Sequence, residues 1–340
     1  MPHFLITGGA GYIGSVLIPR LLAEHHRVTV IDCFYFGKNT LLRHPSLTCV
    51  VQESRQITQE QLSDVDVVVD LAAMSNDPCG ETFEALTWKV NHQARVRTAQ
   101  LAKQAGVPRY ILPSSCSVYG FRHEQVDEQS ETNPLTTYAR ANLKAEEDIL
   151  PLASDSFCVT TLRLATVFGY SPRMRLDLVI NAMTYSAWKH GEIIIHGGGS
   201  QYRPLVHIKD VAAAIVAIAK APLQTINGEI FNVGSDKLNC KISDIAEQVQ
   251  GMMQKNGRPI QVIHNGPQDL RSYRVRFAKI KERCFWQSHH SLHEEIHHIT
   301  KKLDSGRIRV DQCCYTLDWY QKILFEPTAP SITFANQPNL

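Results

Sequence analysis

Residues 7–14, TGGAGYIG, decide the fold of this chain. They follow the short apolar run His3–Thr7 and precede a stretch with helical periodicity. Three of the glycines, Gly8, Gly11 and Gly14, have the spacing G-x-x-G-x-x-G. Such glycines permit a tight turn, bring backbone N–H groups up to a pyrophosphate and let a helix begin close to its strand. A strand, a glycine loop and a helix in this order predict the first βαβ unit of a dinucleotide-binding sheet.

The segments after this loop alternate between strand and helix. Apolar runs predict strands at residues 27–31, 48–51, 65–71, 110–113 and 159–164, and residues 83–105 have the pattern of a helix. Repeated strand, helix and strand units require right-handed crossovers and a parallel sheet that is covered on both faces. The predicted fold class is therefore α/β, a Rossmann doubly wound parallel sheet.

The strict alternation stops after Gly169, which indicates a second, smaller α/β lobe at the C-terminal side. Residues 210–219 predict a helix and 229–233 a strand, and we assign both to the first domain. The expected organisation is a Rossmann domain of residues 1–169 with 206–235, a substrate-binding lobe of residues 170–205 and 236–326, and a tail of residues 327–340.

Composition excludes several other classes of protein. The 340 residues are 44% hydrophobic and 20% charged with a net charge of +2, which is typical of a globular chain and indicates no nucleic-acid surface. The longest apolar run, residues 211–219, is far shorter than the roughly 20 residues of a membrane span. The first predicted strand begins almost at Met1, which leaves no room for a signal peptide. Nine cysteines without CxxC pairs indicate reduced thiols, so we expect a cytoplasmic protein.

Asp32 indicates which dinucleotide binds. It ends the second predicted strand, where a carboxylate can accept hydrogen bonds from the adenosine ribose hydroxyls. Residues 33–37 contain no Arg or Lys that could bind a 2′-phosphate, and the first cation is Lys38. The sequence therefore predicts NAD rather than NADP as the cofactor.

The chain resembles the extended short-chain dehydrogenase/reductases of the NAD-dependent epimerase/dehydratase family, which act on nucleotide-sugars. The resemblance rests on TGGAGYIG (7–14), Asp32, DLAA (70–73), Asn91, SSCSVYG (114–120), Tyr138 in TTYARANLKAEE, LRLATVFG (162–169) and RPLVHIKD (203–210), in this order. It implies a homodimer formed through two helices of each subunit. It also implies that NAD is bound by Gly8, Gly11, Tyr12, Ile13, Gly14, Asp32, Leu71, Ala72, Ala73, Asn91, Tyr138 and Asn142.

Tyr138 and Ser115 are the catalytic residues that the resemblance implies. We expect the Tyr138 phenol to take a proton from a sugar hydroxyl while hydride leaves the same carbon for nicotinamide. Ser115, which precedes the VYG signature at 118–120, would hydrogen-bond the same sugar oxygen.

Position 142 departs from the family pattern, because Asn142 stands where the resemblance calls for the lysine of Tyr-x-x-x-Lys. Residues i and i+4 share one face of a helix, so that lysine would lie near the phenolate and hold the nicotinamide ribose. A cation about 5 Å away at an effective dielectric near 20 favours phenolate by about 3 kcal/mol, on the order of two pK units. Arg140 and Lys144 point to other sides of the helix. The sequence predicts a weaker base and activity that rises toward alkaline pH, with the pH profile of Asn142→Lys as the test.

The residues after Ser115 narrow the reaction. Sugar 4,6-dehydratases of the family have an Asp-Glu pair there for the elimination step, whereas this chain has Cys116-Ser117. Neither side chain is a good general acid for expelling water, so a dehydratase is disfavoured. We interpret Cys116 as a buried free cysteine, and an acid/base role in an epimerase as the alternative.

The second lobe is expected to bind the nucleotide diphosphate. Arg203 and Arg271 come from separate segments, and two guanidinium groups can clamp a pyrophosphate. Further candidates for substrate binding are Asn76, Asp77, Ser115, Thr166, Asn181 and Arg274.

Two clusters of polar residues carry no function in our interpretation. Residues 288–298 contain five histidines, but apolar residues occupy one face of the same helix, so we expect a solvated face and no metal. Glu146, Glu147 and Asp148 are interpreted as exposed residues.

The sequence as a whole predicts an NAD-dependent nucleotide-sugar epimerase that works by transient hydride transfer at a sugar carbinol, with a nucleotide-diphosphate sugar as its partner. Two alternatives stay open. One is a reductase of a nucleotide-linked keto-sugar, in which tyrosine acts as an acid. The other is a non-catalytic dinucleotide-sensing regulator, which Asn142 supports and Tyr138 disfavours.

Overall fold

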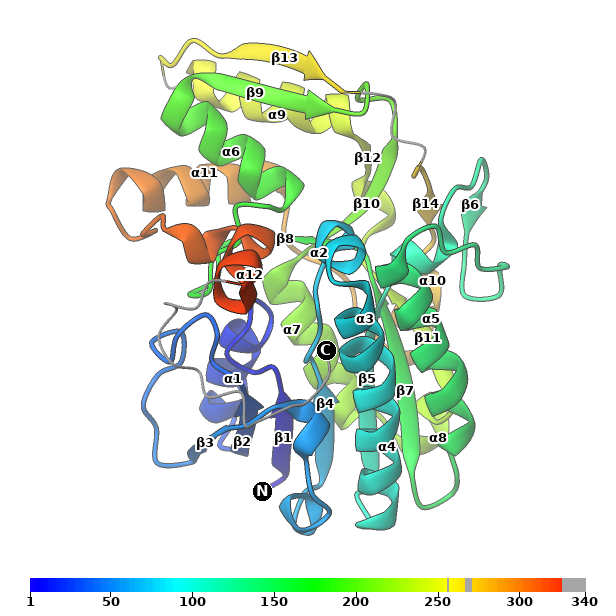
Figure 1. The fold of residues 1–340 in the computed structure, drawn as a ribbon. Helices are drawn as coiled ribbons and strands as arrows, with labels where there is room; N and C mark the ends of the chain where they lie inside the picture. The colour runs from blue at the N-terminus through cyan, green and yellow to red at the C-terminus, as the bar shows by residue number, and fades with distance from the viewer. Residues whose placement is uncertain (256, 267–270, 326–340) are drawn as a thin grey trace.

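The structure is a computed structural model that describes residues 1–255, 257–266 and 271–325 (Figure 1). Its centre is a sheet of seven parallel strands in the order β11-β7-β5-β4-β1-β2-β3. The strands are β1 (His3–Thr7), β2 (Arg27–Asp32), β3 (Leu47–Val51), β4 (Val67–Asp70), β5 (Arg109–Ser115), β7 (Cys158–Leu164) and β11 (Glu229–Val233). The predicted α/β class and the parallel Rossmann sheet are confirmed.

The strand order reverses at β1. The chain runs outward from β1 through β2 to β3 and then returns to the other side of β1 with β4. Thr7, the last residue of β1, therefore pairs with both Ile31 and Asp70. Doubly wound sheets bind their ligands outside the carboxyl ends of the strands at such a reversal. In this chain the reversal lies beside the glycine loop.

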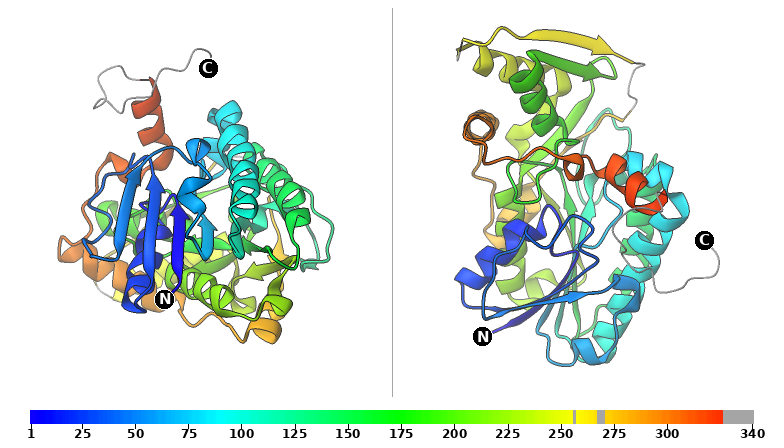
Figure 2. Two further views of the ribbon diagram at one scale, coloured as in Figure 1. Left: turned by 90° about the horizontal axis from the view of Figure 1, so that it is seen from below. Right: turned by 60° about the vertical axis from the view of Figure 1, so that its left-hand side comes forward.

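Helices cover both faces of the sheet, because alternate strand residues bury apolar side chains on opposite sides (Figure 2). Phe4 and Ile6 of β1 pack with α1 (Gly14–Ala23) and α7 (Ile208–Lys220). Leu5 packs in a separate cluster with α4 (Arg95–Gln104) and α5 (Thr137–Ile149).

The predicted helix 83–105 is divided into three parts. It consists of α3 (Glu84–Thr87), a π-helical segment (Trp88–Ala94) and α4. Short π-helical segments inside longer helices often occur at functional sites. This one contains Asn91 and leads directly into Arg95.

A smaller lobe lies above the carboxyl end of β1 and β4 in Figure 1. It has its own apolar core, built from α6 (Val179–His190), α9 (Ile242–Lys255) and α11 (Leu292–Asp304). Its strands are β8 (Thr166–Phe168), β9 (Glu192–His196), β10 (Tyr202–His207), β12 (Asn239–Lys241) and β13 (Gln261–Asn265). Two short strands, β6 (Gln125–Val126) and β14 (Arg274–Val275), pair beside it, and α8 (Leu223–Ile226) precedes β11.

Parts of the chain beyond residue 236 return to the large sheet. Helix α10 (Ala278–Cys284) contacts β11, and α12 (Thr316–Phe325) contacts α2 (Asp77–Thr82), as Figure 2 shows for α12. The predicted division into two lobes stays a prediction, and the predicted tail at 327–340 lies outside the described residues. Helix α12 thereby closes one side of the space between the sheet and the smaller lobe.

Candidate active site

A cavity of about 450 Å³ lies between the carboxyl end of the sheet and the smaller lobe. Its walls bring together fifteen of the predicted site residues from segments far apart in the sequence. They are Gly8, Gly11, Tyr12, Ile13, Gly14, Asp32, Leu71, Ala72, Ala73, Asn76, Ser115, Tyr138, Thr166, Arg203 and Arg271. The cavity is therefore the candidate active site.

Three predicted asparagines are buried behind the cavity wall. Asn91 accepts a hydrogen bond from the Met74 N–H (2.8 Å) and donates one to the Met74 carbonyl (3.0 Å). Asn181 accepts from the Gly169 N–H (3.0 Å) and donates to the Arg175 carbonyl (2.9 Å). Asn142, which is 1% exposed, bonds its neighbours in a similar way, described below. Asn91 and Asn181 thus position the loops that line the cavity, and direct ligand contacts by all three stay predictions.

Two glycines of the loop lie where a side chain would clash with neighbouring backbone. Gly8 has φ +63°, and a Cβ on it would lie 2.8 Å from the backbone of Ala72. A Cβ on Gly14 would lie 2.2 Å from the Gly9 carbonyl oxygen. These two glycines therefore let the loop turn tightly against the end of β4 and let α1 begin close to the loop, which is the backbone arrangement of a phosphate-binding loop.

A buried arginine whose Nη2 donates to the Thr316 hydroxyl (2.9 Å) also lines this cavity. Arg173 is 5% exposed, lies over the Phe36 ring at 3.7 Å, and its Nη1 atom has no hydrogen-bond partner among the described residues. Burial, followed by the charge of Arg175, lowers the pKa of Arg173 to about 10. A buried donor that opens to a cavity fits an anionic group, so the residues present fit a dinucleotide pyrophosphate.

Asp32 occupies the position expected for a ribose ligand at the end of β2. Its carboxylate accepts hydrogen bonds from the N–H groups of Ala10 (2.9 Å) and Phe34 (2.6 Å). Burial raises the pKa of Asp32, and these two hydrogen bonds oppose the rise. The nearest cation in the sequence, Lys38, lies over the Phe34 ring and is not part of the cavity wall, while Arg55 in that wall is paired with Glu53.

Tyr138 lies in the first turn of α5, whose N-terminus is capped by Thr136. The Thr136 hydroxyl oxygen accepts from the Ala139 N–H (3.2 Å) and its O–H donates to Asp77 (2.7 Å). Ser115 ends β5 and its oxygen accepts from the Ser117 N–H (3.1 Å). Burial raises the pKa of the Tyr138 phenol, whereas the nearby Arg95 charge and a hydrogen bond with Ser115 oppose the rise. Both predicted catalytic residues thus meet in one cavity.

The two predicted arginines of the substrate side also meet. Arg203 donates to the Arg271 carbonyl, and Arg271 forms an ion pair with Asp77. Arg274, the further candidate, is exposed and donates to the His123 carbonyl, outside the cavity wall.

Sequence reasoning missed several charged residues of the cavity. Arg173, Arg175 and Asp177 follow β8, and Arg175 holds Asp177 in two hydrogen bonds of 2.9 and 2.7 Å. Arg95 in α4 is also part of the wall. It was not predicted because its contact with Asn142 joins two different helices, and the sequence pattern of one helix does not show such a contact.

Cys116 points away from the cavity. It is 1% exposed, its thiol donates to the Arg163 carbonyl (3.2 Å), and burial raises its pKa well above the usual value. This surrounding fits the interpretation of a buried free cysteine, since a reactive thiolate needs an electropositive and accessible place.

The prediction that Glu146 is exposed was wrong. Glu146 is 2% exposed and forms an ion pair with Arg163, with 2.7 Å between Oε2 and Nη2. Glu146 is buried whereas Glu147 is exposed, because consecutive helix residues point in different directions and position 146 faces the sheet.

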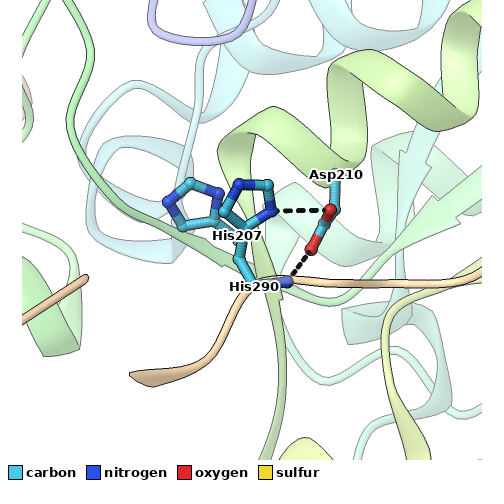
Figure 3. Close-up of side chains that lie close together, drawn as sticks. All are labelled: His207, Asp210 and His290. Atoms are coloured by element: carbon cyan, nitrogen blue, oxygen red, sulfur yellow. Dashed lines mark hydrogen bonds and ion pairs between the residues drawn. The ribbon is translucent and has the colours of Figure 1, made fainter. Parts of the chain in front are cut away.

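One group of potential metal ligands lies outside the cavity. His207, Asp210 and His290 place their ligand atoms within 4.8 Å of one another, and the two imidazole rings stack (Figure 3). Several of their atoms have other partners. Nδ1 of His207 accepts from the Lys209 N–H, whereas Nε2 has no hydrogen bond among the described residues and lies 3.1 Å from Glu295. Asp210 accepts from residues 288–290, including the His290 ring. We therefore interpret the cluster as a structural contact that attaches residues 288–290 to α7. His289, His293 and His297 are exposed.

A doubly wound sheet with a glycine loop, an acidic residue after β2 and a tyrosine–serine pair in one cavity defines a dinucleotide-dependent enzyme. The sequence model of the NAD dependent epimerase/dehydratase family matches residues 4–234. The chain belongs to this family, which is an enzyme family with NAD as its cofactor.

Similar proteins include enzymes of nucleotide-sugar chemistry. The chain is 28% identical over 264 residues to the uncharacterized UDP-glucose epimerase YtcB of Bacillus subtilis (strain 168), covering 73% of this chain and 82% of that protein. It is 26% identical to UDP-glucuronic acid decarboxylase 1 of Arabidopsis thaliana, covering 86% and 68%.

Solved structures share the fold. The UDP-glucose 4-epimerase of Thermotoga maritima, solved with UDP-glucose, matches with a TM-score of 0.80 and 22% identity, covering 90% of this chain and 100% of that chain. MoeE5, solved with UDP-glucuronic acid and NAD, matches with a TM-score of 0.80 and 23% identity, covering 89% and 99%. None of the described helices combines the length and apolar composition that a membrane span requires.

Proposed function

We propose that this protein is an NAD-dependent nucleotide-sugar epimerase that inverts a sugar carbinol by transient hydride transfer. The observation that carries the proposal is the position of Tyr138 and Ser115 in the same cavity as the glycine loop. The phenolate of Tyr138 would accept the hydroxyl proton of a carbinol whose carbon also faces the redox ring, and the shared cavity supports this arrangement.

Different residues of the cavity would bind the cofactor, transfer the proton and bind the substrate diphosphate. The glycine loop, Asp32 and Arg173 would hold the dinucleotide, and NAD when bound supplies acceptance and return of a hydride. Tyr138 takes the proton from the sugar hydroxyl and later returns it, while Ser115 hydrogen-bonds the same oxygen and holds it in place. Arg203 and Arg271 would bind the diphosphate of the substrate.

Three carboxylates of the cavity wall are paired with arginines, which supports epimerisation over elimination of water, and the fourth, Asp32, lies at the position expected for the cofactor ribose. Asp77 is paired with Arg271, Asp177 with Arg175 and Glu53 with Arg55. A general acid that expels water needs an available proton near neutral pH. Burial alone would raise the pKa of Asp177, but Arg175 outweighs burial and lowers it to about 2, so Asp177 does not offer such a proton.

The test is to incubate the purified protein with NAD and a panel of UDP- and other nucleotide-sugars and to analyse products by NMR. An epimer that appears without net change in NADH absorbance supports the proposal. A keto-sugar reductase would instead run in reverse and form NADH from the added NAD, or consume NADH stoichiometrically when NADH and a nucleotide-linked keto-sugar are supplied, and release of CO₂ would support a decarboxylase. Tightly bound NAD without turnover of any sugar would support the regulator.

We also propose that the enzyme is a cytoplasmic homodimer. All nine cysteines are free, which supports a reducing compartment. Family resemblance supports the dimer, and light scattering at micromolar concentration tests it, since a monomer mass would overturn it.

A further inference from the structure

Arg95 is a buried cation without an acidic partner. Its side chain is 3% exposed, and no carboxylate of the described residues forms an ion pair with it. Its Nε–H donates to the Ala72 carbonyl (3.1 Å) and its Nη1 to the Asn142 side-chain oxygen (2.8 Å). Nη2 has no hydrogen-bond partner in the described part of the chain. A buried charge is costly when it is not paired, so its presence indicates an anion that forms or binds beside it.

Asn142 connects this cation to the catalytic helix. The oxygen of its amide accepts from Arg95, and its nitrogen donates to the Tyr138 carbonyl (2.9 Å). Asn142 itself does not line the cavity, whereas Arg95 does. The side chain at the i+4 position from Tyr138 thus holds a guanidinium from another helix at the cavity wall.

Three charged residues act on the Tyr138 hydroxyl, and two of them are neutralised by partners. Arg175, from the segment before α6, is paired with Asp177, and Asp77, from α2, is paired with Arg271. Arg95, from α4, is the remaining charge. Burial raises the pKa of the Tyr138 phenol, and the Arg95 charge opposes this rise.

We propose that Arg95 supplies, from α4, the positive charge beside the Tyr138 hydroxyl that a lysine at position 142 would otherwise supply, and that Asn142 orients it. This inference deepens the proposed function and rests on it for the role of Tyr138 as the base. Arg95 is a positioning residue, since it acts through the ionisation of Tyr138.

The size of the effect follows from the electrostatics. A cation about 5 Å from the phenol at an effective dielectric near 20 changes the pKa by about two units. Loss of this charge should therefore reduce the phenolate fraction about a hundredfold at neutral pH, and alkaline conditions should restore much of it.

The test uses four variants of the full chain. Arg95→Met removes the charge, Arg95→Lys keeps it, and Arg95→Met combined with Asn142→Lys returns a cation to the position four residues after Tyr138. Arg97→Met is the matched control, because Arg97 is an exposed arginine of the same helix that donates to the Ile57 carbonyl. Thermal melts of all four separate effects on the phenol from effects on folding.

The first measurement needs no turnover. With 3,5-difluorotyrosine at position 138, whose phenol ionises at lower pH than tyrosine, absorbance follows the phenolate in protein to which neither cofactor nor substrate is added. Arg95→Met should raise the apparent pKa by about two units, Arg95→Lys and the double variant should bring it back, and Arg97→Met should leave it unchanged. An unchanged pKa in folded Arg95→Met would overturn the inference.

The second measurement is the pH profile of turnover. Arg95→Met should lower kcat about a hundredfold at neutral pH and move the profile toward alkaline pH, with little change in KM for the sugar. A loss of equal size at every pH, without rescue by the double variant, would contradict the inference. If no nucleotide-sugar is turned over, the proposed function is wrong. The titration of residue 138 still tests whether Arg95 lowers the pKa of the phenol.

Discussion

Glu146 of α5 and Arg163 of β7 form a buried ion pair next to Ser114, the residue that precedes Ser115. Their side chains are 2% and 4% exposed. The Glu146 carboxylate also accepts a hydrogen bond from Ser114, the residue before Ser115. Burial alone would lower the pKa of Arg163, but the Glu146 charge outweighs it and the pKa is raised. The pair thus attaches the helix that bears Tyr138 to the strands that bear and flank Ser115.

Neutralising Glu146 should destabilise the fold strongly. In Glu146→Gln the Arg163 guanidinium stays buried without its counter-charge, and breaking such a pair typically costs about 3–5 kcal/mol. Urea unfolding of Glu146→Gln measures the loss of free energy of unfolding. Glu147→Gln is the matched control, because Glu147 is the next residue on the helix and its side chain is 55% exposed. Equal stability of the two variants would contradict the assignment.

Removing the phenolic oxygen should abolish turnover but not cofactor binding. Tyr138→Phe keeps the ring in the first turn of α5 and loses the group that takes the proton, so kcat should fall at least a thousandfold. Dissociation constants for NAD, measured by tryptophan fluorescence, should change little. Ser115→Ala should lower kcat less, because the tyrosine remains. Substantial turnover by Tyr138→Phe would show that another residue is the base.

The fold could be predicted from the sequence because it depends on local patterns. Apolar runs of strand length and the glycine loop placed β1, β2, β3, β4, β5, β7 and β11 within a few residues of their observed bounds. The position of the cavity could also be predicted, since the carboxyl ends of the strands of a doubly wound sheet meet at one edge.

Charged residues whose role depends on packing between helices could not be predicted in the same way. Spacing along α5 can identify only residues of the same helix, such as Arg140 and Lys144. It gives no information about Arg95, which lies on the neighbouring helix α4. The burial of Glu146 could not be predicted, because its partner Arg163 lies in β7, where every residue is buried. A strand buried on both faces does not alternate between apolar and polar residues, so its pattern does not show which helix residue pairs with Arg163.

Asn142→Lys alone should now have little effect on the pH profile, in contrast to the sequence-based expectation. A lysine at position 142 would be added beside Arg95, so the two buried cations would repel each other and the Arg95–Asn142 hydrogen bond would be lost. We expect lower thermal stability and no gain in kcat at neutral pH. The same substitution in Arg95→Met should instead raise kcat. Melting temperatures and pH profiles of the single and double variants measure this coupling, and equal gains in both backgrounds would contradict it.

Asp177 should make part of the stability sensitive to acid. Burial alone would raise its pKa, but Arg175 outweighs burial and the pKa falls from 3.8 to about 2. A group whose pKa is lower in the folded state contributes stability above its unfolded pKa and loses it as the pH falls through the folded pKa. The difference of nearly two units corresponds to about 2 kcal/mol, present above about pH 4 and lost by about pH 2.

Asp177→Asn removes this titration and leaves the buried Arg175 unpaired, so the variant should be less stable than the parent at neutral pH. The parent and Asp177→Asn should differ in their free energy of unfolding, measured by urea at several pH values. This difference should become smaller by about 2 kcal/mol as the pH falls from about 5 to 2. Asp155→Asn serves as the control, because Asp155 is exposed and does not line the cavity. If the difference between Asp177→Asn and the parent stays constant over this range, the Arg175–Asp177 pair does not carry the acid sensitivity.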